Sequence, residues 1–152
     1  MSNANEPESQ EYNGWCIRTG ADFRQRIRLS DPTQPNPDYP ATSKFKYLPK
    51  PLDAFTFQMD IRTRNSKDAP LVISLTNANG GIIQALDADA DAGFLTFFID
   101  DTVTVDDTNP ESIANQDKVF FDLFQIPTTP GADREFLFNG KIEVKHTITD
   151  VQ

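Results

Sequence analysis

The acidic stretch over residues 87–93 comes nearest to a metal site in residue type and spacing. Asp87, Asp89 and Asp91 alternate with alanines, as carboxylates do in the first half of an EF-hand calcium loop. The match ends there, because the glycine comes one place late and Phe98 stands where a bidentate glutamate is needed. We therefore expect a solvated acidic turn, and we expect no metal or other cofactor.

Residues suited to catalysis are few. His146 is the only histidine and Cys16 the only cysteine, so a multi-imidazole metal centre, a serine-protease triad and an intramolecular disulfide are all hard to assemble. Carboxylates suited to glycoside hydrolysis are too numerous to single any out. The sequence has neither a phosphate-binding loop nor a dinucleotide fingerprint. We expect no enzymatic activity.

Three closely spaced arginines are the strongest candidates for binding. Arg24, Arg26 and Arg28 occupy alternate positions, so in a strand they leave the same face. Planar guanidinium groups pair bidentately with carboxylates, and the stripe therefore suits an acidic edge on a partner. The alternative is pairing within the same sheet, for example with Asp60 or Glu143.

A proline-rich loop over residues 30–53 supplies the second set of candidate contacts. Its prolines disfavour regular strand pairing and favour an extended arm. Loops of this length inside a compact domain are usually functional or disordered. Because Tyr39, Phe45 and Tyr47 are interleaved with the prolines, we expect the segment to dock on a partner.

Period-two alternation is the main signal of secondary structure. It predicts half-buried strands over residues 23–29, 54–62 and 141–147. Residues 94–99 and 119–126 are instead apolar at both alternating sets of positions. Strands of this kind are covered on both faces, and we expect one face in the core and the other in an interface.

Turn-forming residues separate these strands. Residues 130–133 predict a hairpin loop, and Gly140 is expected to adopt a positive φ in a turn before Lys141. One short helix is expected to start near Asn109. Together these segments predict an all-β fold, an antiparallel β-sandwich, Ig-like or similar, of about seven or eight short strands.

Charge and hydropathy limit the classes of partner. The formal net charge is -9, and no lysine or arginine lies between Lys67 and Lys118. Phosphate backbones favour clustered basic residues, so we expect no nucleic-acid partner. The acidic middle either forms a solvated surface or, in a head-to-tail assembly, faces the more basic first half of a neighbouring copy.

Residues 1–13 are polar and acidic, without the apolar run of a secretory signal. No apolar run is long enough to span a membrane, so we expect no membrane partner. We interpret residues 1–13 as a polar arm and residues 14–152 as a single domain made in the cytoplasm.

The last third of the chain carries three short motifs in succession. They are VFFDLFQI at residues 119–126, FLFNGKIEVK at residues 136–145 and TIT at residues 147–149. The succession resembles a family of small bacteriophage tail, baseplate and neck proteins, which end in a YDLEL strand, a hairpin, an LLxGxVxV unit and a terminal VT. Phe121 stands at the tyrosine position. The resemblance extends upstream, less specifically, to Ala21, apart from the proline-rich loop.

The resemblance implies a structural component of a virion, in the tail, baseplate or neck, that docks a fibre or adaptor. It implies partners that are other copies of the chain and other virion tail or neck proteins, and a final location in the virion after synthesis in the host cytoplasm. An alternative from a different class is a carbohydrate-binding β-sandwich module. Such a module would recognise a host surface glycan through exposed aromatics such as Trp15, Tyr39 and Tyr47.

Overall fold

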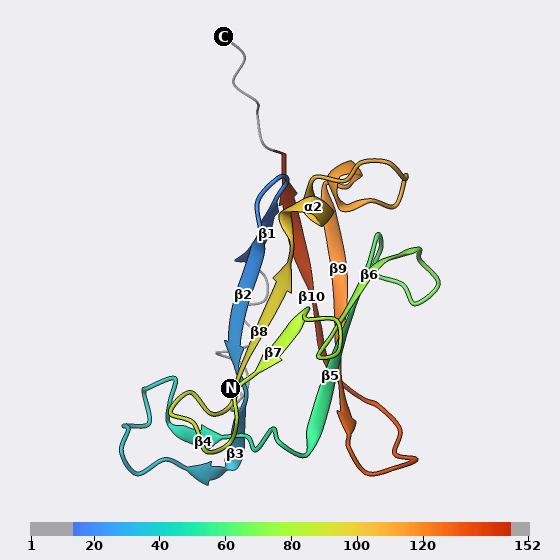
Figure 1. Cartoon of the computed structure of the whole chain (residues 1–152). Coiled ribbons are helices and arrows are strands. Elements are labelled where there is room, and N and C mark those ends of the chain that lie inside the picture. The colour runs from blue at the N-terminus through green and yellow to red at the C-terminus, as the bar shows by residue number, and fades with distance from the viewer. Residues whose placement is uncertain (1–13, 147–152) are drawn as a thin grey trace.

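The computed structural model describes residues 14–146, and Figure 1 shows the arrangement of the elements. The predicted arm over residues 1–13 and the last motif of the resemblance, residues 147–149, lie outside the described residues. No helix between residues 14 and 146 is long and apolar enough to cross a membrane. The elements are β1 (Trp15–Arg18), β2 (Phe23–Arg28), β3 (Ser30–Pro35), β4 (Tyr47–Pro49), β5 (Phe55–Arg62), β6 (Leu71–Thr76), β7 (Ile82–Gln84), β8 (Phe94–Ile99), the helix α2 (Asp101–Thr104), the 3-10 helix η2 (Ile113–Asn115), β9 (Lys118–Pro127) and β10 (Glu135–Lys145).

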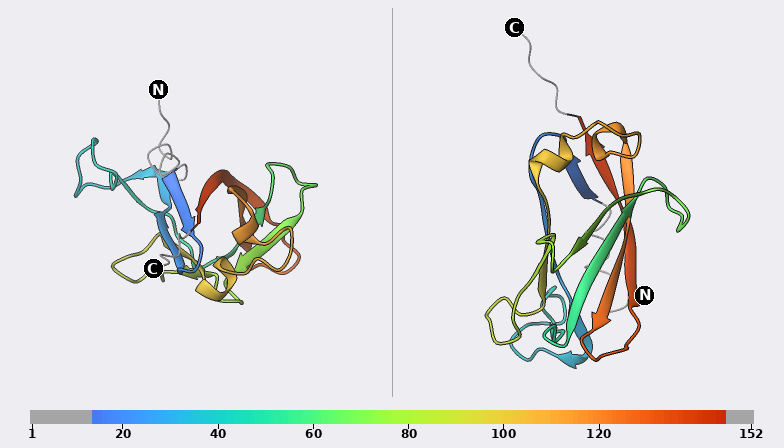
Figure 2. Two further views of the ribbon diagram at one scale, coloured as in Figure 1. Left: turned by 90° about the horizontal axis from the view of Figure 1, so that it is seen from above. Right: turned by 45° about the vertical axis from the view of Figure 1, so that its right-hand side comes forward.

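Two sheets face each other, as the two views of Figure 2 show. One sheet has the strand order β1-β10-β9-β5-β6, and the other has the order β2-β8-β7. All pairs are antiparallel except β1 with β10, which are parallel. This arrangement confirms the predicted antiparallel β-sandwich. Eight strands make up the two layers within the described residues, and β3 and β4 pair separately.

The core lies between the two sheets and follows from the alternation of the sequence. Phe57 of β5 and Phe97 of β8 are fully buried from opposite layers. Trp15 of β1 is 2% exposed, and its ring stacks on that of Phe121 of β9, with centroids 5.0 Å apart and planes 6° apart. Each such side chain contributes roughly 1.5–3 kcal/mol through removal of apolar surface from water.

The strands predicted to be apolar on both faces are the central strands of their sheets. In both β8 and β9, buried residues alternate with half-buried ones. The half-buried set includes Phe94 and Phe98 on β8 and Phe120 and Phe124 on β9. One face therefore lies in the core, as predicted, and the other face carries aromatic rings at the surface of the sandwich. The interface predicted for that outer face stays a prediction.

The proline-rich segment is more regular than predicted. Strands β3 and β4 pair with each other, although the register is irregular between Ser30 and Pro35. The segment is therefore partly paired and is not the unpaired extended arm that the prolines predicted. A two-stranded sheet has two edges, and a residue without an N–H group is tolerated on an edge. Backbone hydrogen bonds also extend the pairing, from Asn36 N to Lys46 O over 2.7 Å and from Lys50 N to Leu29 O over 3.0 Å.

Two local predictions near the end of the chain have different outcomes. The hairpin loop expected at residues 130–133 connects β9 to β10, and Gly131 there has a φ of 80°. The turn expected at Gly140 is wrong, because Gly140 lies inside β10 opposite Phe121 and has no positive φ. The register shift of β10 lies earlier, between Phe136 and Phe138, and the pairing with β9 continues through Gly140.

Candidate interaction site

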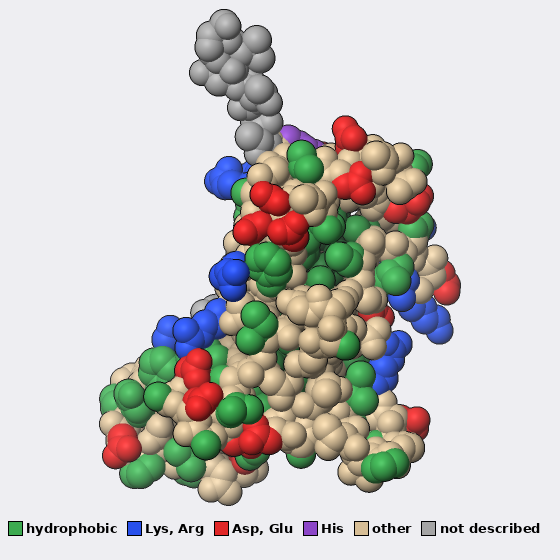
Figure 3. Space-filling view, viewed as in Figure 1, with side chains coloured by type: hydrophobic (Ala, Val, Ile, Leu, Met, Phe, Trp, Pro, Cys, Tyr) green, Lys and Arg blue, Asp and Glu red, His purple; other side chains and the backbone are tan. Residues whose placement is uncertain are grey.

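The arginine stripe lies on the outer face of the three-stranded sheet, supported by aromatic rings. In the register of β2 with β8, Arg24 lies opposite Phe98. The Arg24 guanidinium carbon is 4.8 Å from the centroid of the Phe98 ring, and that of Arg26 is 3.7 Å from the centroid of the Phe94 ring. Such contacts stabilise by about 0.5–1 kcal/mol each at exposed positions. Figure 3 shows basic side chains along the same side of the molecule as β2.

The alternative explanation of the stripe, pairing with Asp60 or Glu143 in the same sheet, is wrong. Both acids belong to the five-stranded sheet. Asp60 pairs with arginines of that sheet and its hairpin loop, and Glu143 pairs with Lys141 over 3.1 Å. Within residues 14–146, no salt bridge involves Arg24 or Arg26. The charges of these two arginines are therefore not neutralised by a carboxylate of the described part of the chain.

A hollow of about 460 Å³ lies beside the stripe, between the proline-rich segment and the acidic turn. Its lining includes Arg26, Arg28, Tyr39 and Phe45, which are four of the six residues predicted for an interface. The rings of Tyr39 and Phe45 are in contact, with centroids 5.4 Å apart. The structure thus brings together two arginines and two aromatic rings from segments separated in the sequence, and we call this site the Arg26–Tyr39 hollow.

The remaining predicted interface residues lie next to the hollow. Arg24 is on the same face of β2, and Tyr47 is half-buried in β4. The Nη2 of Arg28 donates a hydrogen bond of 2.9 Å to the backbone carbonyl of Tyr47, and the Arg28 guanidinium carbon is 5.0 Å from the centroid of the Phe45 ring. Arg28 therefore joins β2 to the proline-rich segment and holds one wall of the hollow.

The acidic turn forms the opposite wall of the hollow, and Gly93 allows this turn to pack closely against the proline-rich segment. Gly93 has a φ of +88°, and a Cβ there would lie 2.7 Å from the Cβ of Pro49 and 2.8 Å from the carbonyl oxygen of Leu29. Only glycine fits so close a contact at this φ without strain. The Asp87 carboxylate accepts a hydrogen bond of 2.6 Å from the amide of Leu52. Asp87 thus braces this turn against the end of the proline-rich segment. Asp87, Asp89 and Asp91 are all exposed, in agreement with the predicted solvated acidic turn.

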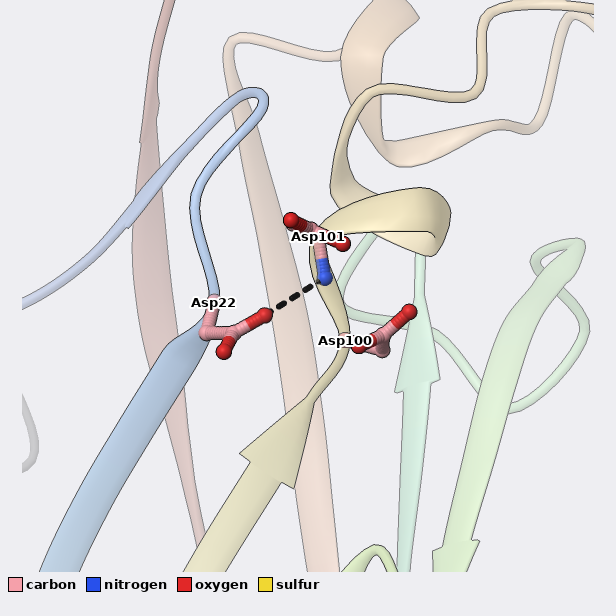
Figure 4. A group of neighbouring side chains, drawn as sticks. All are labelled: Asp22, Asp100 and Asp101. Atoms are coloured by element: carbon pink, nitrogen blue, oxygen red, sulfur yellow. Dashed lines mark hydrogen bonds between the residues drawn. The ribbon is translucent and has the colours of Figure 1, made fainter.

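A cluster of three aspartates lies at the other end of the sandwich, away from the acidic stretch whose spacing resembles that of a calcium loop. Carboxylate oxygens of Asp22, Asp100 and Asp101 lie within 4.8 Å of one another, and Figure 4 shows their arrangement. The Asp22 carboxylate accepts a hydrogen bond of 2.8 Å from the Asp101 amide, and Asp100 caps helix α2. Hydrogen bonds from the hydroxyl and amide of Thr102 lower the pKa of Asp100. Capping accounts for this arrangement, and we assign no metal to it.

The sequence did not point to a second polar cluster, on the outer face of the five-stranded sheet. Asp60 is 5% exposed and accepts hydrogen bonds of 2.7 Å from Ser74 Oγ and 2.8 Å from Gln58 Nε2. Its Oδ2 lies 3.5 Å from Arg134 Nη1 and 3.9 Å from Arg62 Nη2. We call these five residues the Asp60 cluster. Burial raises the pKa of Asp60, but the hydrogen bonds and the two arginines outweigh it, and the pKa lies below its ordinary value.

A second carboxylate lies directly across from the Asp60 cluster. Asp122 of β9 is the cross-strand partner of Asp60 of β5. Burial raises the pKa of Asp122, and the Asp60 charge adds to the rise against the opposing charges of Arg62 and Arg134. The sequence could predict only the position of Asp60 in its strand. The contacts of Asp60 with Ser74 and Arg134 could not be predicted, because these residues belong to segments distant in the sequence.

Comparison with known proteins adds nothing to the fold class that the strand topology defines. No protein-family model matches the chain, and no curated protein matches it. Among solved structures, a murine CRIg structure is similar over 86% of this chain and 89% of its own length, with 8% sequence identity and a TM-score of 0.33. A likeness this weak bears on neither function nor partners. The sheet topology alone shows the β-sandwich, and the candidate site is defined by the residues of this chain.

Proposed function

We propose that this chain is a structural component of a bacteriophage virion, located in the tail, baseplate or neck, and that it works by protein–protein assembly. The observation that supports assembly is the exposed pair Arg24 and Arg26, stacked on phenylalanines and not neutralised by any carboxylate of residues 14–146. The motifs in the last third of the chain support the virion. Its partners are other copies of the chain and other tail or neck proteins, one of them a fibre or adaptor.

The mechanism is geometric rather than catalytic. A rigid sandwich presents the arginine stripe and the Arg26–Tyr39 hollow on one side, and repeated copies add affinity through repeated contacts. Arginine stacked on a ring is already ordered, so it loses little freedom when it pairs with a carboxylate on a partner. Surface charge pairs contribute little to folding, and the effect of the stripe is therefore expected in assembly rather than in stability.

Immunogold labelling of intact particles with an antibody against this chain tests the proposal. Labelling at the neck or at one end of the tail is the expected result. Unlabelled particles, with free protein in the lysate, would overturn it. As a second readout, replacing the exposed Arg24 and Arg26 with serine in the phage genome is expected to lower particle yield while the purified variant stays folded, and an unchanged yield would remove the stripe from the proposal.

A glycan-binding module is the second candidate, and the hollow itself favours it. Tyr39 is 47% exposed and lines the hollow together with Asn36 and Asp91, a combination of ring and polar groups that suits a small sugar. The structure removes Trp15 from this candidate, because that side chain is buried in the core. Saturable glycan binding by the isolated chain that is lost in Tyr39→Ala would favour this function over assembly.

A further inference from the structure

We infer that the Arg26–Tyr39 hollow receives residues 5–11 of a neighbouring copy of the same chain. This inference rests on the proposed function of assembly and names the partner of that site. It combines the shape and charge of the hollow with the sequence of the segment that precedes β1. That segment lies outside the described residues.

The chemistry of the hollow favours an acidic, proline-containing peptide. In its lining the two arginines, Arg26 and Arg28, outnumber the single carboxylate of Asp91, and the contacting rings of Tyr39 and Phe45 supply an apolar wall. Guanidinium groups bind carboxylates through charge-assisted hydrogen bonds. Aromatic-lined hollows dock proline-containing segments, whose restricted backbone loses little entropy on binding.

Residues 5–11 match both requirements. They read Asn-Glu-Pro-Glu-Ser-Gln-Glu and carry three glutamates and no basic residue. Pro7 biases Glu6 toward an extended backbone. Glu6 and Glu8 are two residues apart, and in an extended chain their side chains leave the same side at roughly 7 Å, the spacing of alternate residues on β2. The spacing of the Glu6 and Glu8 carboxylates in an extended segment therefore matches the spacing of the alternate arginines on β2.

The concave form of the site and the reach of the segment favour a partner in trans. Two walls flank the hollow, the proline-rich segment and residues 90–92, so an extended peptide enters it more readily than a folded acidic surface does. Glu6 and Glu8 lie eight and six residues before Gly14, so when the segment is extended they are at most about 29 Å and 22 Å from it, against a radius of gyration of about 15 Å for a compact domain of this length. Each copy thus has a segment long enough to reach a neighbour and a hollow to receive one, which is a heterologous contact.

A mixing experiment with full-length variants tests the inference. The arm variant carries Glu6→Gln, Glu8→Gln and Glu11→Gln and keeps the hollow. The hollow variant carries Arg26→Ser and Tyr39→Ser and keeps the arm. Sedimentation velocity of each protein, alone and mixed in equal amounts, measures association, and circular dichroism melting verifies that each variant is folded.

The wild type is expected to self-associate, and each variant alone is expected to do so at least about tenfold more weakly, through loss of charge-assisted pairs. An equal mixture is expected to form one-to-one pairs, because the arm of the hollow variant enters the hollow of the arm variant. Arg64→Ser with Lys67→Ser removes exposed basic charge elsewhere and is the matched control, expected to associate like the wild type.

Three results would overturn the inference. They are a wild type that stays monomeric, variants that associate as strongly as the wild type, and a mixture that forms no pairs. The third result would show that the segment acts within its own chain. None of them bears on whether the protein is part of a particle, because immunogold labelling decides that independently. Failure of the proposed docking of residues 5–11 can therefore be distinguished from failure of the proposed virion function.

Discussion

Arginine stacks on phenylalanine on both outer faces of the sandwich, but the arginine charge is paired with a carboxylate on only one of them. On the five-stranded sheet, the Arg134 guanidinium carbon lies 3.9 Å from the centroid of the Phe124 ring, and its Nη1 lies 3.5 Å from the buried Asp60 carboxylate. On the three-stranded sheet, the Arg26 guanidinium carbon lies 3.7 Å from the centroid of the Phe94 ring, and Arg26 has no salt bridge to any carboxylate of the described residues. The same two residue types therefore stabilise the fold on one face and remain available to a partner on the other.

The largest effect is expected from removing the carboxylate of the Asp60 cluster. Asp60→Ala leaves Arg62 and Arg134 without their partner and removes the hydrogen bonds from Ser74 and Gln58. The free energy of unfolding is expected to fall by about 2–3 kcal/mol, because hydrogen bonds to a charged, largely buried group are among the stronger ones. Urea denaturation followed by fluorescence measures the change. A loss below about 0.5 kcal/mol would mean that the cluster is not structural.

A smaller effect is expected from removing one arginine of the same cluster. Arg134→Ser loses the ring contact with Phe124 and one charge near Asp60. The Arg134 side chain is about half exposed, so the expected loss is about 1 kcal/mol. The same denaturation series measures it. A loss as large as that of Asp60→Ala would show that Arg134, rather than the hydrogen bonds from Ser74 and Gln58, provides most of the stabilisation.

The smallest effect, with the opposite sign, is expected at Asp122. The pKa of Asp122 is raised in the folded state. The free energy of unfolding therefore increases as the pH falls through this folded pKa, and it decreases as the pH rises through it. The folded pKa of Asp60 is lowered, so its contribution is present above the unfolded pKa of about 3.9 and is lost as pH falls through the folded value. Asp122→Asn is expected to raise the free energy of unfolding at neutral pH by roughly 0.5 kcal/mol, chiefly because an amide has no charge to desolvate on partial burial.

Denaturation of Asp122→Asn and the wild type across the acidic range measures both signs. The variant is expected to be the more stable protein at neutral pH, with the difference shrinking as the wild-type Asp122 becomes protonated. A variant less stable than the wild type at neutral pH would contradict the assignment of Asp122 as a carboxylate whose charge is penalised by burial.

Strand positions were predictable because alternation is a local property. Residues 23–29 and 54–62 correspond closely to β2 and β5, since burial of one face fixes which residues alternate. The turn at Gly140 was misplaced because a glycine inside a strand and a glycine in a turn look alike in sequence. The pairing of β3 with β4 was missed because prolines were taken to prevent it, whereas edge positions tolerate them.

The candidate site was predictable in part. Arg26, Arg28, Tyr39 and Phe45 were expected at an interface from residue type and spacing, and the structure places them around one hollow. The rings beneath the arginines were not predicted, because they depend on the register of β2 against β8. The acidic turn that forms the opposite wall was not predicted either, because its position depends on Gly93 packing against Pro49.

The measurement that tests the contrast most directly pairs two double variants, Arg24→Ser with Arg26→Ser and Arg62→Ser with Arg134→Ser, in sedimentation velocity and urea denaturation. The first pair is expected to lose self-association with a fall in unfolding free energy of at most about 1 kcal/mol. The second is expected to lose about 2 kcal/mol and to associate like the wild type. A first pair that destabilises the fold while association persists would contradict the account that the stripe on β2 serves a partner.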